Sequence, residues 1–437
     1  MRVPPPFLPR HAPAAFFAAA LVPLAVGAVL PPAGHARVAG PAATSPALAL
    51  TPERAGALRA RIAADMPRIV ERWIGISEIA APSGEEGARG ARIEKELREL
   101  GLEEVRRDEI GNVSGVLRGR TPRGPKRVVY AAHLDTVASR TDSVSVGRPD
   151  PGQLQGPGVR DDASGLVGLL EAVHALKDSG LAPPDDVWIV ATVQEEVGLL
   201  GAKKFLDDNA RRIARFVAVD GELGEISCGA TGIVWLKAHF LSDGAHTLRS
   251  PGLPNPAHAL ARAVTAISAI EAPRAPESRQ SWVNVTMLSG ASVVNAMPAD
   301  AWFTVDVRSN SPEMLDRLVR SVRGEVERAA RATGVGVAVE EILRIPGAAP
   351  PGRGRSPFAI LVGEALTAAG EGPPSFTLRG TADHNRALER GIPGLSIGVT
   401  TGAGIHTPRE TASIARMPGG IAALAILMAS LPADLPP

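Results

Sequence analysis

Hydrophobic positions follow two different patterns along the chain. Short, continuous apolar runs followed by polar residues occur before residue 229 and again after residue 346. Such runs are typical of strands buried on both faces, and helical spacing between them indicates covering helices. The expected strands are Arg127–His133, Asp186–Val193, Phe216–Asp220 and Leu395–Thr400, and the expected helices include Ala88–Leu100, Ser164–Lys177 and about Ala202–Phe216. Strand alternating with helix predicts an α/β domain with a parallel or mixed sheet.

The middle of the chain alternates between apolar and polar residues, as half-exposed strands do. Its expected elements are strands at Gly232–Leu241, Ser281–Gly290, Ala299–Arg308 and Val335–Ile342, and helices at Ala257–Ala269 and Met314–Thr333. Strand–helix–strand–strand–helix–strand is the order of a ferredoxin-like α+β domain. We therefore expect an α/β domain formed by residues 51–228 and 347–437, interrupted by a smaller α+β domain at 229–346.

The N-terminus resembles a secretory signal peptide. Arg2 and Arg10 precede the apolar stretch Ala14–Leu30, and small residues follow up to Ala36. We expect residues 1–36 to be a signal peptide that directs export, and residues 37–50 to be a disordered lead-in. An uncleaved membrane anchor is the alternative. Cleavage would remove two arginines and no acid, so the mature chain would become slightly negative. It would also remove the apolar stretch, and the mature chain would keep no membrane span.

Composition excludes several classes of function. The 437 residues carry a net charge of +1 and only 9 Phe, 5 Trp and 1 Tyr. This leaves neither a basic field nor a stacking surface for nucleic acid. The single cysteine excludes a cysteine-rich zinc site or an iron–sulfur cluster built by this chain alone.

Polar residues with metal-ligand chemistry follow the expected strands. His133 and Asp135 lie two residues apart, so a strand would place both on one face. Asp135 could take the second N–H of a metal-bound imidazole. A strand-end histidine bonded to a turn aspartate is the structural alternative.

Asp161 and Asp162 open an expected helix; a helix cap explains one aspartate well and a pair less well. Asp161 is our candidate for a carboxylate that bridges two cations.

Three further strand ends complete the set. Glu195 and Glu196 follow one buried strand, where one acid could bind metal while the other takes a proton from water; a solvated turn is the alternative. Asp220 ends the next strand, and His406 follows the last. Ligands of α/β sheets gather outside the carboxyl ends of the strands. Histidine and carboxylate ligands without sulfur suit Zn²⁺, Co²⁺ or Mn²⁺. An Asp161 shared between two ions predicts a pair of such ions, and zinc is the metal we expect.

These segments resemble those of the M20 (M20/M25/M40-type) metallopeptidases, in the family's order. The matching segments in and around the α/β part are AAHLDTV, GPGVRDDASGL, ATVQEEVGLLGAK, VAVDGE and GIHTPRE, and those in the inserted part are SDGAHT, VVNAMPAD and VDVRS. RGTADHNRALERGIP followed by GIHTPRE is most similar to the peptidase T-like, tripeptidase-like branch. One departure is Ala163-Ser164 where many members have lysine after the paired acids.

The resemblance implies a fold and a role for each residue. The fold would be a hydrolase-like α/β catalytic domain with a ferredoxin-like dimerisation domain, or lid. His133 and Asp220 would hold one metal, Glu196 and His406 the other, and Asp161 would bridge them. Glu195 would be the general acid/base and Asp135 would orient His133. The residues expected to reach substrate are His246, which would stabilise the oxyanion in a neighbouring subunit, together with Asn295, Arg308, Asp383 and His384.

The expected function is an exported exopeptidase that hydrolyses short peptides with metal-activated water. A deacylase of N-acyl amino acids would use the same metal centre, and the sequence does not separate the two. An exported peptide-binding protein that has lost catalysis is a third hypothesis, but it predicts a missing ligand or base. A homodimer through the inserted domain is expected, because His246 acts only if it reaches an active site.

Overall fold

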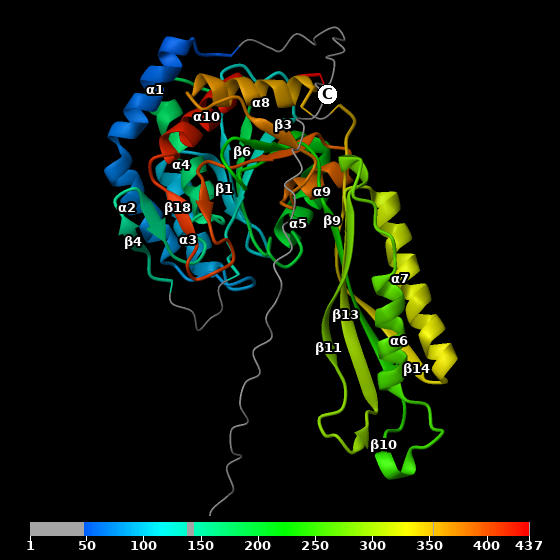
Figure 1. Cartoon of the computed structure of the whole chain (residues 1–437). Helices are drawn as coiled ribbons and strands as arrows, with labels where there is room; N and C mark the ends of the chain where they lie inside the picture. The colour runs from blue at the N-terminus through cyan, green and yellow to red at the C-terminus, as the bar shows by residue number, and fades with distance from the viewer. Residues whose placement is uncertain (1–47, 138–143, 353, 437) are drawn as a thin grey trace, which may run out of the picture. The chain divides into compact units, whose positions relative to one another are not determined.

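An eight-stranded mixed sheet forms the core of the chain outside residues 229–346 (Figure 1). The computed structural model describes residues 48–436 apart from 138–143 and 353, so the expected signal peptide and most of the lead-in lie outside the described residues. The strand order is β1-β2-β6-β3-β7-β16-β8-β15. The strands are β1 (Glu103–Arg107), β2 (Val113–Leu117), β3 (Arg127–His133), β6 (Val187–Thr192), β7 (Ile213–Ala218), β8 (Glu225–Ser227), β15 (Ser375–Thr377) and β16 (Gly394–Ile397). Because β6, β3, β7 and β16 run parallel, their carboxyl ends meet at one edge of the sheet.

Helices bury both faces of this sheet. In β3, Val128, Tyr130 and Ala132 belong to one hydrophobic cluster, while Val129 and Ala131 belong to another. This alternation explains why the strand sequence is continuously apolar. The first cluster includes α1 (Pro52–Ala64), α2 (Met66–Ser77), α3 (Gly87–Glu99), α4 (Ala163–Asp178), α8 (Pro357–Ala368) and α10 (Met417–Ser430), and the second includes α5 (Leu200–Asn209) and α9 (His384–Glu389). Among the described residues, no helix is both long and apolar enough to cross a bilayer.

Residues 229–346, called here the inserted segment, contain a four-stranded antiparallel sheet in the order β11-β13-β9-β14. Two helices, α6 and α7, pack along one face of it (Figure 1). Its elements are β9 (Gly232–Leu241), β10 (Ala245–His246), α6 (Pro256–Ser268), β11 (Ser281–Ser289), β12 (Ala296–Met297), β13 (Asp300–Ser309), α7 (Pro312–Thr333) and β14 (Gly336–Ile345). The four long strands and two helices follow the predicted order. That the segment is a separate lid or dimerisation domain stays a prediction.

Another four-stranded sheet joins two distant parts of the chain. It contains β4 (Gly147–Asp150), β5 (Gln153–Gln155), β17 (Gly402–Ala403) and β18 (Thr411–Ser413). Pairing of β18 with β5 brings the loop after β5, which carries Asp161, beside the loop that carries His406.

One predicted helix is too long. The expected helix Ala202–Phe216 ends at Asn209 as α5, and Ile213–Ala218 forms β7. Phe205 and Leu206 pack from the helix into the hydrophobic core, as expected. Beyond Arg212, however, the chain pairs with β3. A short apolar run fits either type of element, and here pairing in the sheet decides.

Candidate metal centre

The ends of parallel strands bring the predicted metal ligands together. His133 is the last residue of β3 and pairs with Thr192 at the end of β6. Glu195 and Glu196 follow β6 after a short turn, and Asp220 lies two residues beyond β7. The loops that carry these predicted ligands therefore leave the same edge of the sheet, where α/β folds bind their ligands.

Asp161 lies between two histidines. Its Oδ1 is 2.9 Å from His133 Nε2, and its Oδ2 is 3.1 Å from His406 Nε2. His406 Nε2 is also 3.3 Å from Glu196 Oε2. One oxygen thus faces each imidazole, which is the arrangement expected of a carboxylate that bridges two ions.

The charges at the site match what a divalent cation needs. Burial raises the pKa of Asp220 to about 7, with a further contribution from the nearby Asp161 charge. Hydrogen bonds to Asp161 and Glu196 raise the pKa of His406 to about 10. The carboxylates therefore attract positive charge, which a metal would supply while the imidazoles bind it in neutral form.

The donor set also fits such an ion geometrically. Ligand atoms of His133, Asp161 and Glu196 lie within 4.8 Å of one another. Glu196 Oε1 is buried and accepts no hydrogen bond, and a buried carboxylate oxygen without a donor is costly unless a cation binds it. Nitrogen and oxygen donors of this kind suit Zn²⁺, Co²⁺ or Mn²⁺.

Asp135 supports the centre through both its side chain and its main chain. It is fully buried, and its carboxylate accepts hydrogen bonds from the backbone N–H of Glu195 (2.9 Å), the N–H of Glu196 (3.2 Å) and the hydroxyl of Ser83 (2.6 Å). His133 Nδ1 lies 2.9 Å from the Asp135 carbonyl and 3.4 Å from its carboxylate. Asp135 therefore contacts the His133 ring through its carbonyl and its carboxylate, and the carboxylate also holds the loop of the paired glutamates.

Glu195 is a buried acid beside this cluster. Burial raises its pKa well above the usual range, and the charges of Asp220 and Glu196 act in the same direction. A carboxylate whose pKa is raised is a stronger base than an ordinary glutamate and therefore takes a proton from water more readily. This is the property required of a general acid/base.

The neighbouring Asp162 has a structural role. Its Oδ1 accepts from Gly165 N (3.0 Å) as the N-cap of α4, and its Oδ2 accepts from His133 N (3.0 Å). The aspartate pair therefore divides: Asp162 caps the helix, and Asp161 faces the histidines.

Sequence reasoning missed two supporting residues. Arg89, which is buried in α3, donates to the carbonyls of Leu134, Ile79 and Ser77 and so fixes the turn between His133 and Asp135. Glu410 accepts from Arg160 N (2.7 Å) and Asp161 N (2.9 Å). A helical arginine gives no signal in the sequence, whereas Glu410 stands in the GIHTPRE segment and could have been found there.

The inserted segment brings two of its predicted residues together and separates the third. His246 Nε2 is 3.4 Å from Asn295 Nδ2, and both residues are exposed. Arg308 lies near the opposite end of β13, where its Nε contacts Asp306 at 3.0 Å. Asp300 of β13 pairs with Leu241 and Ser309 pairs with Gly232, so the ladder between the two ends spans about 30 Å at 3.4 Å per residue. The substrate roles of all three stay predictions.

Asp383 and His384 are buried at the start of α9. Asp383 Oδ2 accepts from Thr192 Oγ1 at 2.6 Å, next to the strand end that leads to Glu195. His384 Nε2 lies 2.7 Å from the Gly229 carbonyl, and burial lowers the pKa of its ring to about 4. His384 has no exposed surface in this conformation, and its predicted contact with substrate stays untested.

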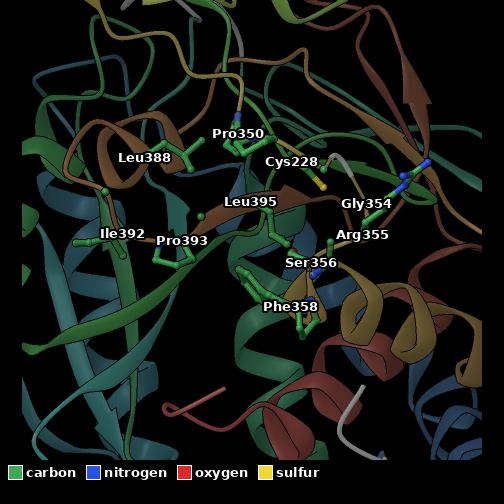
Figure 2. Close-up of a pocket in the computed structure, with 16 residues that line it drawn as sticks. Cys228, Pro350, Gly354, Arg355, Ser356, Phe358, Leu388, Ile392, Pro393 and Leu395 are labelled. Carbon is green, nitrogen blue, oxygen red and sulfur yellow. Dashed lines mark hydrogen bonds between the residues drawn. The ribbon is translucent and has the colours of Figure 1, made fainter. Parts of the chain in front are cut away.

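An apolar cavity of about 570 Å³ lies elsewhere, at the amino end of β16 (Figure 2). Phe358, Ile392 and Leu395 are among its lining residues, with Cys228 and Arg355 also lining it. The predicted metal ligands follow the carboxyl ends of the strands, and none of them lines this cavity.

Comparison with known proteins identifies relatives of this chain. A model of peptidase family M20/M25/M40 matches residues 129–430. Carboxypeptidase G2 from Pseudomonas is 23% identical over 276 residues, which are 60% of this chain and 65% of that protein. Succinyl-diaminopimelate desuccinylase from Dinoroseobacter shibae is 25% identical over 363 residues, which are 76% of this chain and 91% of that protein.

A solved structure shares the fold. The crystal structure of aminopeptidase PepT from Bacillus cereus superposes with a TM-score of 0.68 and 21% identity, and covers 83% of this chain and 98% of that one. The names of these three relatives describe a carboxypeptidase, a desuccinylase and an aminopeptidase. Similarity to them therefore does not identify the substrate of this chain.

Proposed function

Because the chain belongs to peptidase family M20/M25/M40, it is a hydrolase of amide bonds, and we propose that it is an exopeptidase that cleaves short peptides at a centre of two divalent metal ions. The position of Asp161 carries this proposal, since one of its oxygens faces His133 and the other faces His406. Two-metal hydrolases hold their ions about 3.5–4 Å apart, a separation that one carboxylate can span. Zinc is our first expectation for both ions.

Each side chain has a defined task in this proposal. His133 and Asp220 would hold one ion, Glu196 and His406 the other, and Asp161 both. When bound, the two ions would polarise the scissile carbonyl and acidify a water molecule. Glu195 takes the proton of the attacking water and passes it to the leaving amine. Burial supports this task because it raises the pKa of Glu195.

His246 would stabilise the oxyanion that develops on the substrate. Its Nδ1 accepts from Leu248 N at 3.2 Å, so the neutral ring carries its proton on Nε2, and the Asn295 amide beside it then turns its oxygen toward that N–H. An exposed Nε2–H is a suitable donor for an oxyanion. Since β9 extends about 30 Å from Gly232 before the chain reaches His246, we propose that the ring serves the active site of a second subunit in a homodimer. Export through residues 1–36 is part of the same proposal.

The reaction is tested by a substrate screen of the purified, metal-replete protein. We expect hydrolysis of di- and tripeptides that a chelator abolishes and added Zn²⁺ restores. Hydrolysis of N-acyl amino acids without hydrolysis of peptides would favour the deacylase hypothesis over the peptidase hypothesis. Tight peptide binding without chelator-sensitive hydrolysis would instead favour a binding protein and contradict both enzymes.

The role of His246 predicts complementation between two inactive variants. His246→Ala should lower kcat by about 10²–10³-fold, the usual effect of losing one oxyanion donor. When it is refolded or co-expressed with Glu195→Gln, about a quarter of wild-type activity should return, because half of the symmetric dimers are then mixed and carry one intact site of two. No recovery, or a fully active monomer in sedimentation, would contradict the shared site.

A further inference from the structure

The loop that carries His406 is exposed over nearly its whole length. Residues 402–409 are all exposed, and Glu410 is the first buried residue after them, with 1% of its surface accessible. His406 itself adopts a positive φ of 62°. Packing therefore does little to fix the position of this ligand, and the fixed point nearest to it on its C-terminal side is Glu410.

Glu410 fastens this loop to the loop that carries Asp161. Its Oε1 accepts from both Arg160 N (2.7 Å) and Asp161 N (2.9 Å), and its own carbonyl accepts from Gly156 N (2.9 Å). The hydrogen bond from Asp161 N ties the backbone of Asp161 to Glu410, which lies only four positions beyond His406. The pairing of β18 with β5 holds the two loops side by side, and the Glu410 carboxylate is the side chain that joins them next to the candidate ligands.

The other side of the Asp161 loop is held independently. Arg160 Nη1 donates to the Gly221 carbonyl at 3.0 Å and to Glu222 Oε2 at 2.5 Å. These contacts join the loop to the residues directly after Asp220. If the side chain of Glu410 is removed, the side of the centre with His133, Asp161 and Asp220 keeps its own contacts. The His406 loop then keeps only main-chain contacts on its C-terminal side, namely the Glu410 carbonyl on Gly156 N and the pairing of β18 with β5.

We propose that Glu410 is a positioning residue that sets the place of His406 relative to Asp161, and so determines the affinity for the metal held by Glu196 and His406. The proposal rests on the two-metal function proposed above. Some residues bind no metal themselves but hydrogen-bond to a metal ligand. Removing such a residue typically lowers metal affinity by about 10–100-fold. An effect of this size is expected at one of the two ions only.

The test is a Co²⁺ titration of the metal-free full chain, followed by the visible spectrum of bound Co²⁺ and by competition with a chelator. Wild-type protein should bind two ions. Glu410→Ala should bind one ion with unchanged affinity and the other about 10–100-fold more weakly. Glu410→Gln should bind both almost as the wild type does, because an amide oxygen can still accept the two N–H groups. Glu410→Asp, which keeps the charge but shortens the reach, should resemble Glu410→Ala.

Glu371→Ala is the matched control. Glu371 is also a buried glutamate, but it pairs with Arg59 and Arg416, away from the metal ligands. This variant should be less stable yet should bind both ions normally. Unchanged binding of both ions by Glu410→Ala and Glu410→Asp, or equal losses in Glu410→Gln and Glu410→Ala, would overturn the positioning role. A wild-type chain that binds fewer than two ions would overturn the two-metal function instead.

Discussion

Glu195→Gln should retain both metal ions and lose about 10²–10⁴-fold in kcat, which is the range that a general acid/base contributes. Gln has nearly the same shape, so the buried site should remain packed. Its amide, however, cannot take a proton from water or deliver one to the leaving amine. The loss should therefore fall on kcat, with little change in KM, because substrate binding does not require the proton transfer.

The neighbouring residue supplies the control for this prediction. Glu196→Gln changes the same functional group one position along the chain, but Glu196 contacts His406 and has a buried oxygen without a hydrogen-bond donor. It should lose metal as well as activity. Metal content and steady-state kinetics of both variants separate the two roles. Normal turnover of Glu195→Gln would eliminate Glu195 as the base.

The sequence predicted the part of the site that follows from strand periodicity. Parallel strands must end at one edge, so the polar residues at the ends of the expected strands Arg127–His133 and Asp186–Val193 were expected to converge. That geometry was enough to predict that His133 and Glu196 lie close together, and their ligand atoms do lie close together.

Other parts depended on contacts that no local pattern contains. Glu410 and Asp161 are 249 residues apart and meet because β18 pairs with β5. The sequence made Asp161 the candidate for the bridging carboxylate, but only the three-dimensional structure shows that Asp162 caps α4, since either residue could cap a helix. The end of α5 was missed because the apolar residues of β7 continue its spacing, and only pairing with β3 separates the two elements.

Asp161→Asn should prevent the two-metal centre from forming. An asparagine offers one oxygen where the carboxylate offers two. It therefore cannot bind the ion beside His133 and the ion beside His406 at the same time. The number of bound Co²⁺ or Zn²⁺ ions should fall from two to one or none. Turnover should fall by more than about 100-fold, the upper end for residues that only support a ligand.

Asp162→Asn changes the adjacent residue in the same way and should affect folding instead. Both oxygens of Asp162 accept backbone N–H groups, from Gly165 and His133. An asparagine must present its NH₂ group to one of these donors, which leaves a buried N–H unsatisfied at a cost of about 1–3 kcal/mol in the free energy of unfolding. Denaturant unfolding and metal analysis of the two variants should therefore give opposite profiles: lost metal in Asp161→Asn, and lower stability with two ions still bound in Asp162→Asn. If Asp162→Asn is the variant that loses the ions, the two aspartates have been assigned the wrong way round.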